Sequence, residues 1–243
     1  MTVLVKIAFD GTNYRGFQIQ NDAVTVFGTF QQALLRILGH ETRIKGCSRT
    51  DSGVHAKCFY LSFDTQKQLD LRRLPLALNG NLPPDIRVLE AVQVPDGFHA
   101  RYDAKGKEYT YYILNSHIDS PFFNGYYYKV AASLDVESMQ QAAKNFVGKW
   151  DFSAFMSKNS SVTDFVRTVS YADVKKDGDM IKFVVRADGF LYNMVRIMAG
   201  TLVSVGRGLI KAEDIPQIIQ GRDRSAAGPT APAQGLFLTD VFY

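Results

Sequence analysis

The chain has 243 residues, 46% of them apolar, which is enough for one large domain or two small ones with a buried core. No apolar run approaches the roughly 20 residues that cross a bilayer, and Met1 leads directly into a strand-like segment, so we expect a cytoplasmic protein without membrane spans. The formal net charge of +4 permits a polyanionic partner without demonstrating one.

The two cysteines, Cys47 and Cys58, are too few for a disulfide scaffold and lack the paired spacing of a zinc site. We expect them to be reduced thiols on neighbouring strands. The histidines show no matched ligand spacing either. The sequence therefore predicts no metal site.

The first hundred residues alternate between strand and helix patterns. Residues 3–9 place apolar side chains on one face with a period of two, which predicts a strand. Residues 26–38 repeat apolar side chains every three or four positions, and Gly39 follows where a helix C-cap belongs. Further segments complete the order strand, helix, strand, strand, helix, strand: strands at 43–47, 54–63 and 86–94, and a short helix at 70–78.

The rest of the chain repeats this order. A strand at 108–114 precedes a helix at 136–147 that Gly148 caps. Asp177-Gly178 suits the tight turn of a hairpin. The two strands of that hairpin are predicted at 165–176 and 180–187. A further helix is predicted at 191–205, and a final strand at 236–242.

Two successive βαββαβ units predict an α+β fold with two pseudo-symmetric, ferredoxin-like halves, 1–100 and 101–243. The repeat lies in the order of elements and not in residue identity. Three irregular stretches fall outside this scheme, and such loops more often cover a site than build a core: 116–124, 157–164 and 226–235.

One loop gathers unusual chemistry. Residues 49–55, Arg-Thr-Asp-Ser-Gly-Val-His, lie between two predicted strands and hold a carboxylate, a guanidinium, two hydroxyls and an imidazole. A plain structural interpretation remains open, in which Asp51 accepts backbone amide bonds in an Asx-type turn and Arg49 pairs at the surface.

Residues 49–56 resemble the catalytic loop of the TruA family of tRNA pseudouridine synthases. The resemblance continues in order along nearly the whole chain through five further blocks: Phe98-His99-Ala100-Arg101, Lys107-Glu108-Tyr109, Asp151-Phe152-Ser153-Ala154-Phe155, Phe190-Leu191-Tyr192-Asn193-Met194-Val195-Arg196, and Pro229-Thr230-Ala231-Pro232-Ala233. The departures are Ser48 where Gly is usual, Ser52 where Ala is common and Phe17 where Trp is common. None removes a group that the chemistry needs.

The resemblance implies a pseudouridine synthase core with a central cleft, and an isomerase that converts uridine to pseudouridine in tRNA without a cofactor or metal. It implies that Asp51 is the catalytic aspartate, Arg196 the partner of its carboxylate, Tyr109 the aromatic against the target base, and Arg49 a residue that contacts RNA and displaces a base. It also implies a homodimer that modifies positions 38 to 40 of the anticodon stem-loop.

Physical chemistry supports this division of roles. A carboxylate that acts as nucleophile or base must stay ionised in a water-poor pocket, and a guanidinium can offer it a bidentate fork. Alternation places Tyr109 and Tyr111 on one face of their strand and Tyr112 on the other. Arg196 as a surface arginine and Tyr109 as a core tyrosine remain the structural alternatives.

His55 is interpreted as a residue that braces the loop, because four residues on a turn or strand do not make it a neighbour of Asp51. RNA affinity would come mainly from cations on phosphates, which makes binding depend on salt. The candidates are Arg15, Arg101, Lys105, Lys107, Arg167, Lys175, Lys176, Arg222 and Arg224.

Two other functions remain open. One is a pseudouridine synthase of the same family that modifies other uridines. The other is a non-catalytic, ferredoxin-like RNA-binding protein, although the chain lacks the usual aromatic motif of that class. The sequence also leaves open whether Asp51 attacks ribose C1′, adds to uracil C6 or abstracts a proton at C2′.

Overall fold

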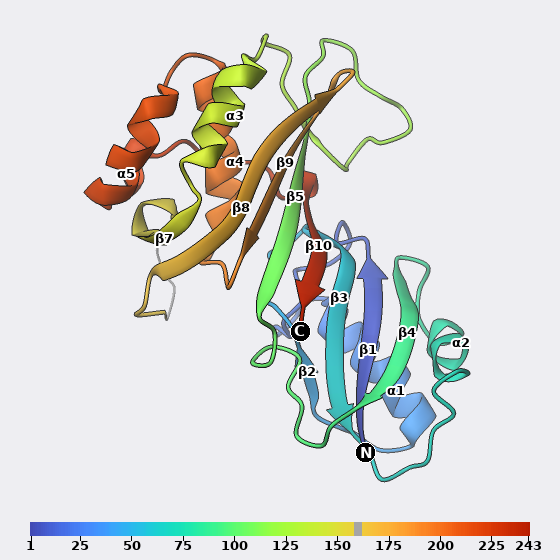
Figure 1. Cartoon of the computed structure of the whole chain (residues 1–243). Coiled ribbons are helices and arrows are strands. Elements are labelled where there is room, and N and C mark those ends of the chain that lie inside the picture. The colour runs from blue at the N-terminus through green and yellow to red at the C-terminus, as the bar shows by residue number, and fades with distance from the viewer. Residues whose placement is uncertain (158–161) are drawn as a thin grey trace. The chain divides into compact units, whose positions relative to one another are not determined.

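The computed structural model describes residues 1–157 and 162–243, and part of the predicted 157–164 loop lies outside this range. The chain forms a mixed α/β structure dominated by strands (Figure 1). It divides into two compact units: unit 1 contains Met1–Lys105 and Phe237–Tyr243, and unit 2 contains Gly106–Leu236. In the part that the structure describes, no helix is both long and apolar enough to cross a membrane.

Unit 1 begins with the predicted order of strand, helix, strand, strand, helix, strand. Its elements are β1 (Thr2–Phe9), α1 (Val26–Leu38), β2 (Ile44–Gly46), β3 (His55–Asp64), α2 (Leu74–Asn79), β4 (Ile86–Val94) and β10 (Leu236–Phe242). β1 pairs antiparallel with both β3 and β4. β2 pairs antiparallel with the end of β3, and β10 pairs parallel with its beginning.

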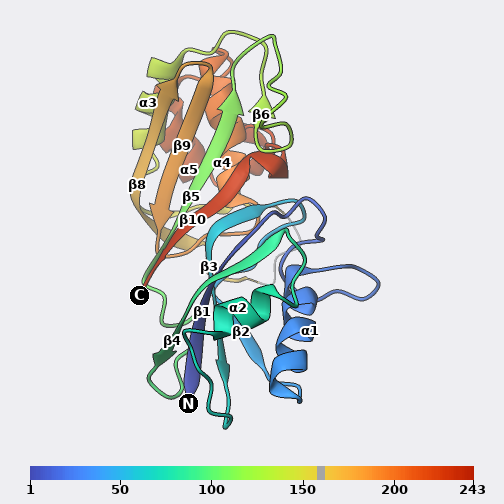
Figure 2. The same cartoon turned by 90° about the vertical axis from the view of Figure 1, so that its right-hand side faces the viewer.

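The sequence explains why α1 begins and ends where it does. The side chain of Thr25 accepts a hydrogen bond from the backbone N–H of Gly28, which satisfies a donor of the first turn. Gly39 ends the helix in the left-handed region, at φ +83°. Phe30 and Leu34 are buried, and α1 and α2 cover the same face of the strands of unit 1 (Figure 2).

The strands of unit 2 lie in the order β5-β9-β8-β7 with antiparallel pairing, and β6 pairs parallel with β5. Its strands are β5 (Gly106–Leu114), β6 (Tyr128–Lys129), β7 (Gly148–Asp151), β8 (Val166–Asp177) and β9 (Met180–Ala187). Its α-helices are α3 (Val136–Lys144), α4 (Met194–Gly206) and α5 (Ile215–Gly221). The described part of the unit also contains short 3-10 helices: η1 (Ser153–Phe155), η2 (Ala212–Asp214), η3 (Arg224–Ala226) and η4 (Ala233–Gly235).

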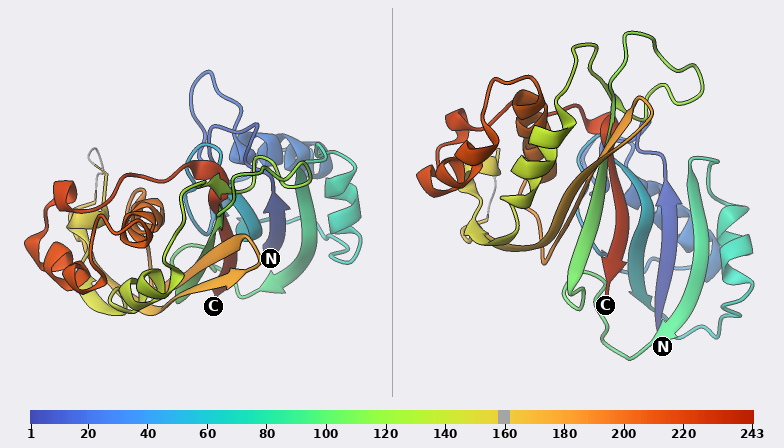
Figure 3. Two further views of the ribbon diagram at one scale, coloured as in Figure 1. Left: turned by 90° about the horizontal axis from the view of Figure 1, so that it is seen from above. Right: turned by 45° about the horizontal axis from the view of Figure 1, so that its top comes forward.

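α4 is the central helix of unit 2. Every one of its residues except Arg196 is buried, and a helix that is apolar all round belongs in a core. α3 packs against β8 and against α4. The three helices lie together beside β8 and β9 (Figure 3). This core holds Arg196 at the first turn of a helix that has little freedom to move.

Several details differ from the sequence expectations. β6, β7 and α5 were not predicted, because they have only two, four and seven residues. The assignment of Gly148 as a helix cap was wrong: α3 ends at Lys144 with Asn145 as its C-cap, and Gly148 begins β7 at φ +132°. The final strand has the predicted bounds, but residues 237–243 lie in unit 1, whereas the sequence analysis placed them with the second half.

Candidate functional site

Asp51 lies on a tight turn of unit 1 between β2 and β3. The turn is closed by a hydrogen bond of 3.2 Å from the backbone N–H of Val54 to the carbonyl oxygen of Asp51. Gly53 adopts φ +77°, which a residue without a side chain tolerates best. The Asp51 side chain is half-buried, and the Arg49 side chain before it is exposed.

Two backbone donors of this turn, the N–H groups of Gly53 and Val54, donate to carbonyl oxygens. An Asx turn at Asp51 would use the N–H groups two and three residues later. The N–H of Gly53 instead donates to the carbonyl of Tyr14 at 3.3 Å, and that of Val54 donates to the carbonyl of Asp51. These two bonds close the turn through the main chain, and neither of these donors is used by an Asx turn at the Asp51 carboxylate.

A second segment, residues 10–17, holds the turn from outside. The N–H of Phe17 donates to the carbonyl of Thr50 at 3.2 Å, and the Ser52 hydroxyl lies 3.3 Å from the Tyr14 carbonyl. Gly16, at φ +85°, approaches so closely that a Cβ there would lie 2.4 Å from the Thr50 carbonyl oxygen. Only glycine permits this contact between two stretches of backbone.

The 10–17 segment is itself anchored in unit 1. The buried Tyr14 donates from its hydroxyl to Asp85 at 2.6 Å, and burial followed by this hydrogen bond raises the pKa of Tyr14. The hydroxyl therefore stays protonated as a donor. Phe17 is buried with its ring centroid 4.5 Å from that of Phe59. Phe thus fills a core position at the site where the family commonly has Trp.

His55 begins β3 just after the turn and is almost fully buried. Its Nδ1 accepts a hydrogen bond of 3.1 Å from the backbone N–H of Gly11, and its ring stacks on Phe237 at 4.5 Å. Nδ1 also lies 3.0 Å from the Asp10 carboxylate, so His55 joins the beginning of β3 to the 10–17 segment.

Tyr109 lies on β5 in unit 2 and is only 6% exposed. Its ring meets Phe190 edge-on, with centroids 5.1 Å apart. Tyr111, two residues later on the same strand face, is fully buried and donates to the carbonyl of Pro232 at 2.7 Å. Burial raises the pKa of Tyr111, and the nearby positive charge of Arg196 acts in the opposite direction.

Arg196 is half-buried, and two hydrogen bonds of 2.8 Å orient its guanidinium. Nε donates to the carbonyl of Ala231, and Nη1 donates to the side-chain oxygen of Asn193. Asn193 in turn donates from Nδ2 to the Ser157 hydroxyl at 2.9 Å. Arg196 is therefore a fixed cation within unit 2 and not a loose surface arginine.

The profile of a family described as tRNA pseudouridine synthase matches residues 6–103 and 142–243. The chain belongs to this family. The family's members are isomerases. This chain is similar to them over nearly its full length, and it is therefore an isomerase.

Several relatives carry the name tRNA pseudouridine synthase A. The protein of Acetivibrio thermocellus is 47% identical over 237 residues, which are 98% of this chain and 97% of that protein. The protein of Thermoanaerobacter sp. strain X514 is 44% identical over 241 residues, 99% of each. That of Halalkalibacterium halodurans is 46% identical over 233 residues, 96% of this chain and 89% of that protein.

The structure of this pseudouridine synthase family member assigns the predicted site residues to particular elements. Arg49 and Asp51 share one turn of unit 1, while Tyr109 and Arg196 lie on β5 and α4 of unit 2. Among the described residues, no three His, Cys, Asp or Glu side chains are grouped to hold a metal ion.

The sequence analysis missed the residues that hold the site residues in place. In unit 1 these are Tyr14 and Gly16; in unit 2 they are Asn193 and Ala231. The last two lie inside blocks that matched the family, so the motif contained them without showing what they do. Gly16 stands beside Phe17 in a stretch that was compared with the family, but only the fold brings it against Thr50.

We expect Gly16→Ala to damage the Asp51 turn specifically. Alanine at either Gly16 (φ +85°) or Gly39 (φ +83°) suffers the strain of the left-handed region, roughly 1–2 kcal/mol. Only at Gly16 does the new Cβ meet backbone, whereas nothing lies within 4 Å at Gly39. Urea unfolding should therefore show a clearly larger loss of stability for Gly16→Ala than for Gly39→Ala. Equal losses would contradict the close backbone contact.

Proposed function

We propose that this enzyme converts uridine to pseudouridine at positions 38 to 40 of the tRNA anticodon stem-loop, with Asp51 as the catalytic carboxylate. Membership of the tRNA pseudouridine synthase family supports the reaction. The observation that carries the assignment of Asp51 is its turn, in which the main chain and the 10–17 segment supply the scaffold and the carboxylate is not needed to close it.

The reaction redistributes bonds within one nucleotide. The bond from ribose C1′ to uracil N1 breaks, the base turns, and a bond forms from C1′ to C5. C5 loses a proton and N1 gains one, so neither an oxidant nor net hydrolysis is required. One carboxylate suffices in each of the three routes that remain open: attack on C1′, addition to C6, and proton abstraction at C2′.

The remaining roles follow the family resemblance. We assign Arg196 as the cation that pairs with the Asp51 carboxylate, because a guanidinium offers a fixed bidentate fork. The bonds from Arg196 to Asn193 and Ala231 support a fixed orientation. Tyr109 is assigned as the ring against the extruded uracil, and the exposed Arg49 as the residue that occupies the vacated space in the stem.

The wider proposal treats the chain as two pseudo-symmetric, ferredoxin-like halves, 1–100 and 101–243. The antiparallel order β4-β1-β3, with β2 against β3, supports this description for unit 1. We further propose a cytoplasmic homodimer that grips one tRNA and needs no cofactor or metal.

The structure sorts the nine candidate phosphate contacts. Four have partners within unit 2: Arg167 donates to the Asp164 carbonyl at 3.1 Å, Lys175 lies 3.5 Å from Asp173, Arg222 lies 3.3 Å from Asp151, and Arg224 donates to the Gly228 carbonyl at 2.9 Å. Lys107 is half-buried. The other four candidates are exposed and form no hydrogen bond or ion pair through their side chains with the residues that the structure describes, so they are better placed to meet RNA: Arg15, Arg101, Lys105 and Lys176. The guanidinium of Arg101 lies 5.8 Å from the centroid of the Tyr102 ring.

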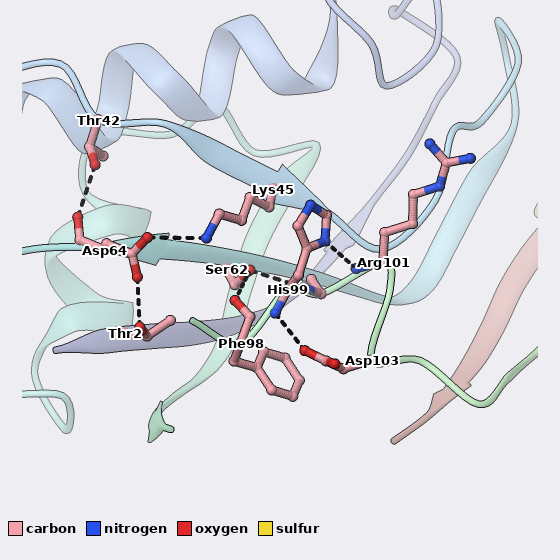
Figure 4. A network of polar contacts seen from close by, with 10 residues as sticks. Thr2, Thr42, Lys45, Ser62, Asp64, Phe98, His99, Arg101 and Asp103 are labelled. Atoms are coloured by element: carbon pink, nitrogen blue, oxygen red, sulfur yellow. Dashed lines mark hydrogen bonds and ion pairs between the residues drawn. The ribbon is translucent and has the colours of Figure 1, made fainter. Parts of the chain in front are cut away.

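Arg101 is the best-anchored of these candidates (Figure 4). Its backbone N–H donates to Nδ1 of His99 at 3.1 Å, and burial followed by the charge of Lys45 lowers the pKa of His99, which keeps Nδ1 an acceptor near neutral pH. The buried Ser62 accepts the N–H of Ala100 at 3.0 Å. The turn is thus rigid while the Arg101 side chain is exposed.

Tritium release from C5 of labelled uridine in unmodified tRNA tests the catalytic assignment. Without added cofactor or metal, we expect release by the wild-type enzyme and none by Asp51→Asn, which keeps the size and loses the charge. Binding of tRNA should stay within a few fold. A loss of folding or of binding in Asp51→Asn would support a structural role for Asp51 instead.

Two arginine variants should separate phosphate contacts from internal braces. Arg101→Ala should weaken tRNA binding and reduce the slope of log Kd against log salt by about 1, because one phosphate contact is lost. Arg224→Ala should leave that slope unchanged and lower the urea midpoint, since it leaves the Gly228 carbonyl without its partner. The reverse pattern would contradict this sorting.

A further inference from the structure

Arg196 occupies a position that an ordinary helix would avoid. It is the third residue of α4, in the first turn, where the partial positive charge of the helix N-terminus disfavours a cation. Every other residue of α4 is buried. A guanidinium at this position requires acceptors that compensate for the unfavourable field, and two acceptors lie within 2.8 Å of it.

The first partner is the N-cap residue, Asn193. Asparagine at this position ordinarily accepts a backbone N–H of the first turn through its side chain, but the Asn193 side chain makes no such capping bond. Its oxygen accepts from Nη1 of Arg196 at 2.8 Å instead. Because a guanidinium only donates, the amide oxygen must face Arg196, and Nδ2 then donates to the Ser157 hydroxyl at 2.9 Å.

The second partner, the Ala231 carbonyl, is part of a loop that is fixed to α4. The N–H of Ala231 donates to the Arg196 carbonyl at 3.1 Å, and the N–H of Gly228 donates to the Thr201 hydroxyl at 2.9 Å. Gly200 lies so close to this loop that an added Cβ would lie 1.8 Å from the Pro229 carbonyl oxygen. The acceptor for Nε therefore cannot shift without unpacking the helix.

We propose that Asn193 is a positioning residue that fixes the plane of the Arg196 guanidinium for catalysis. Two bonds at different nitrogens, one to Asn193 and one to Ala231, prevent the planar group from rotating about its long stem. Of these two bonds, the one to Asn193 comes from a side chain and can be removed by substitution. The inference rests on the proposed role of Arg196.

A simpler explanation for Asn193 makes a different prediction. Asn193 has φ +61°, and asparagine is among the side chains that tolerate this left-handed conformation. If backbone geometry were its only role, glycine would serve at least as well. Asn193→Gly therefore removes the amide while keeping the backbone relaxed. Asp22, exposed and at φ +62°, provides a matched control in Asp22→Gly.

We expect Asn193→Gly to lower kcat by about 10- to 100-fold, because a misplaced catalytic group costs this much, with the KM for tRNA within about threefold. Asp22→Gly should leave both parameters unchanged. An unchanged kcat in Asn193→Gly, or a change confined to KM, would overturn the proposal. The first result would indicate a purely backbone role, and the second a contact with RNA.

A double-mutant cycle with Arg196→Lys tests whether Asn193 acts through Arg196. Lysine lacks the fork that Asn193 orients, so Asn193→Gly should reduce kcat by less than about threefold in the Arg196→Lys background. Losses that multiply in the double variant would show that Asn193 acts independently of the guanidinium and would overturn the proposal.

Nitrogen-15 NMR of labelled arginine supplies a measurement that does not need activity. The Nη1–H group of Arg196 that donates to Asn193 should exchange slowly with water in the wild-type protein and at least about tenfold faster in Asn193→Gly. Unchanged exchange would overturn the proposal. If the wild-type protein shows slow exchange but releases no tritium from any tRNA, the proposed function fails while the orientation of Arg196 by Asn193 remains established.

Discussion

The close contact between the 10–17 segment and the Asp51 turn is the constraint on which unit 1 depends. Two stretches of backbone can approach this closely only because Gly11 and Gly16 have no side chains: a Cβ on either would lie within 2.4 Å of a carbonyl oxygen of residues 50–54. The contact replaces solvent around the turn with fixed hydrogen-bonding groups. A catalytic carboxylate benefits from such rigidity, because its reach toward a ribose or a base must be reproducible.

In unit 2, a buried helix holds the charged residue in a fixed position. α4 is enclosed on all sides, and Arg196 is the only one of its residues that is not buried. The cation is bound to Asn193 and to Ala231, in a loop that packs against the same helix. In both units, backbone carbonyls and small side chains surround the segment that holds the charged residue, Asp51 in unit 1 and Arg196 in unit 2. These surrounding groups are in turn fixed by the packing of the core.

The sequence predicted the elements whose signals are local. The helix 26–38 has the predicted bounds because its capping residues, Thr25 and Gly39, stand directly beside its apolar stripe. β4 and β10 were also predicted within their observed bounds. α5 and β7 were missed because short elements carry too few repeats of the helical or strand period. Gly148 was misjudged because a glycine after a helix can also start a strand.

The sequence predicted which residues belong to the candidate site, but it did not predict the contacts that hold them in place. The motif blocks contained Asp51, Arg196, Asn193 and Ala231, and the family match explains why they occur together in one chain. The supporting contacts join residues far apart in the sequence, such as Ala231 with Arg196 and Gly16 with Thr50. No local pattern records such a pairing, since it depends on how the elements pack.

The most direct test of the central claim is to map pseudouridine across the RNA of cells that lack this gene and that receive back either the wild-type gene or Asp51→Asn. We expect pseudouridine at tRNA positions 38 to 40 to disappear without the gene, to return with the wild type, and to stay absent with Asp51→Asn at equal protein levels. Restoration by Asp51→Asn would contradict the role of the carboxylate, and restoration at other uridines alone would contradict the assignment to the anticodon stem-loop.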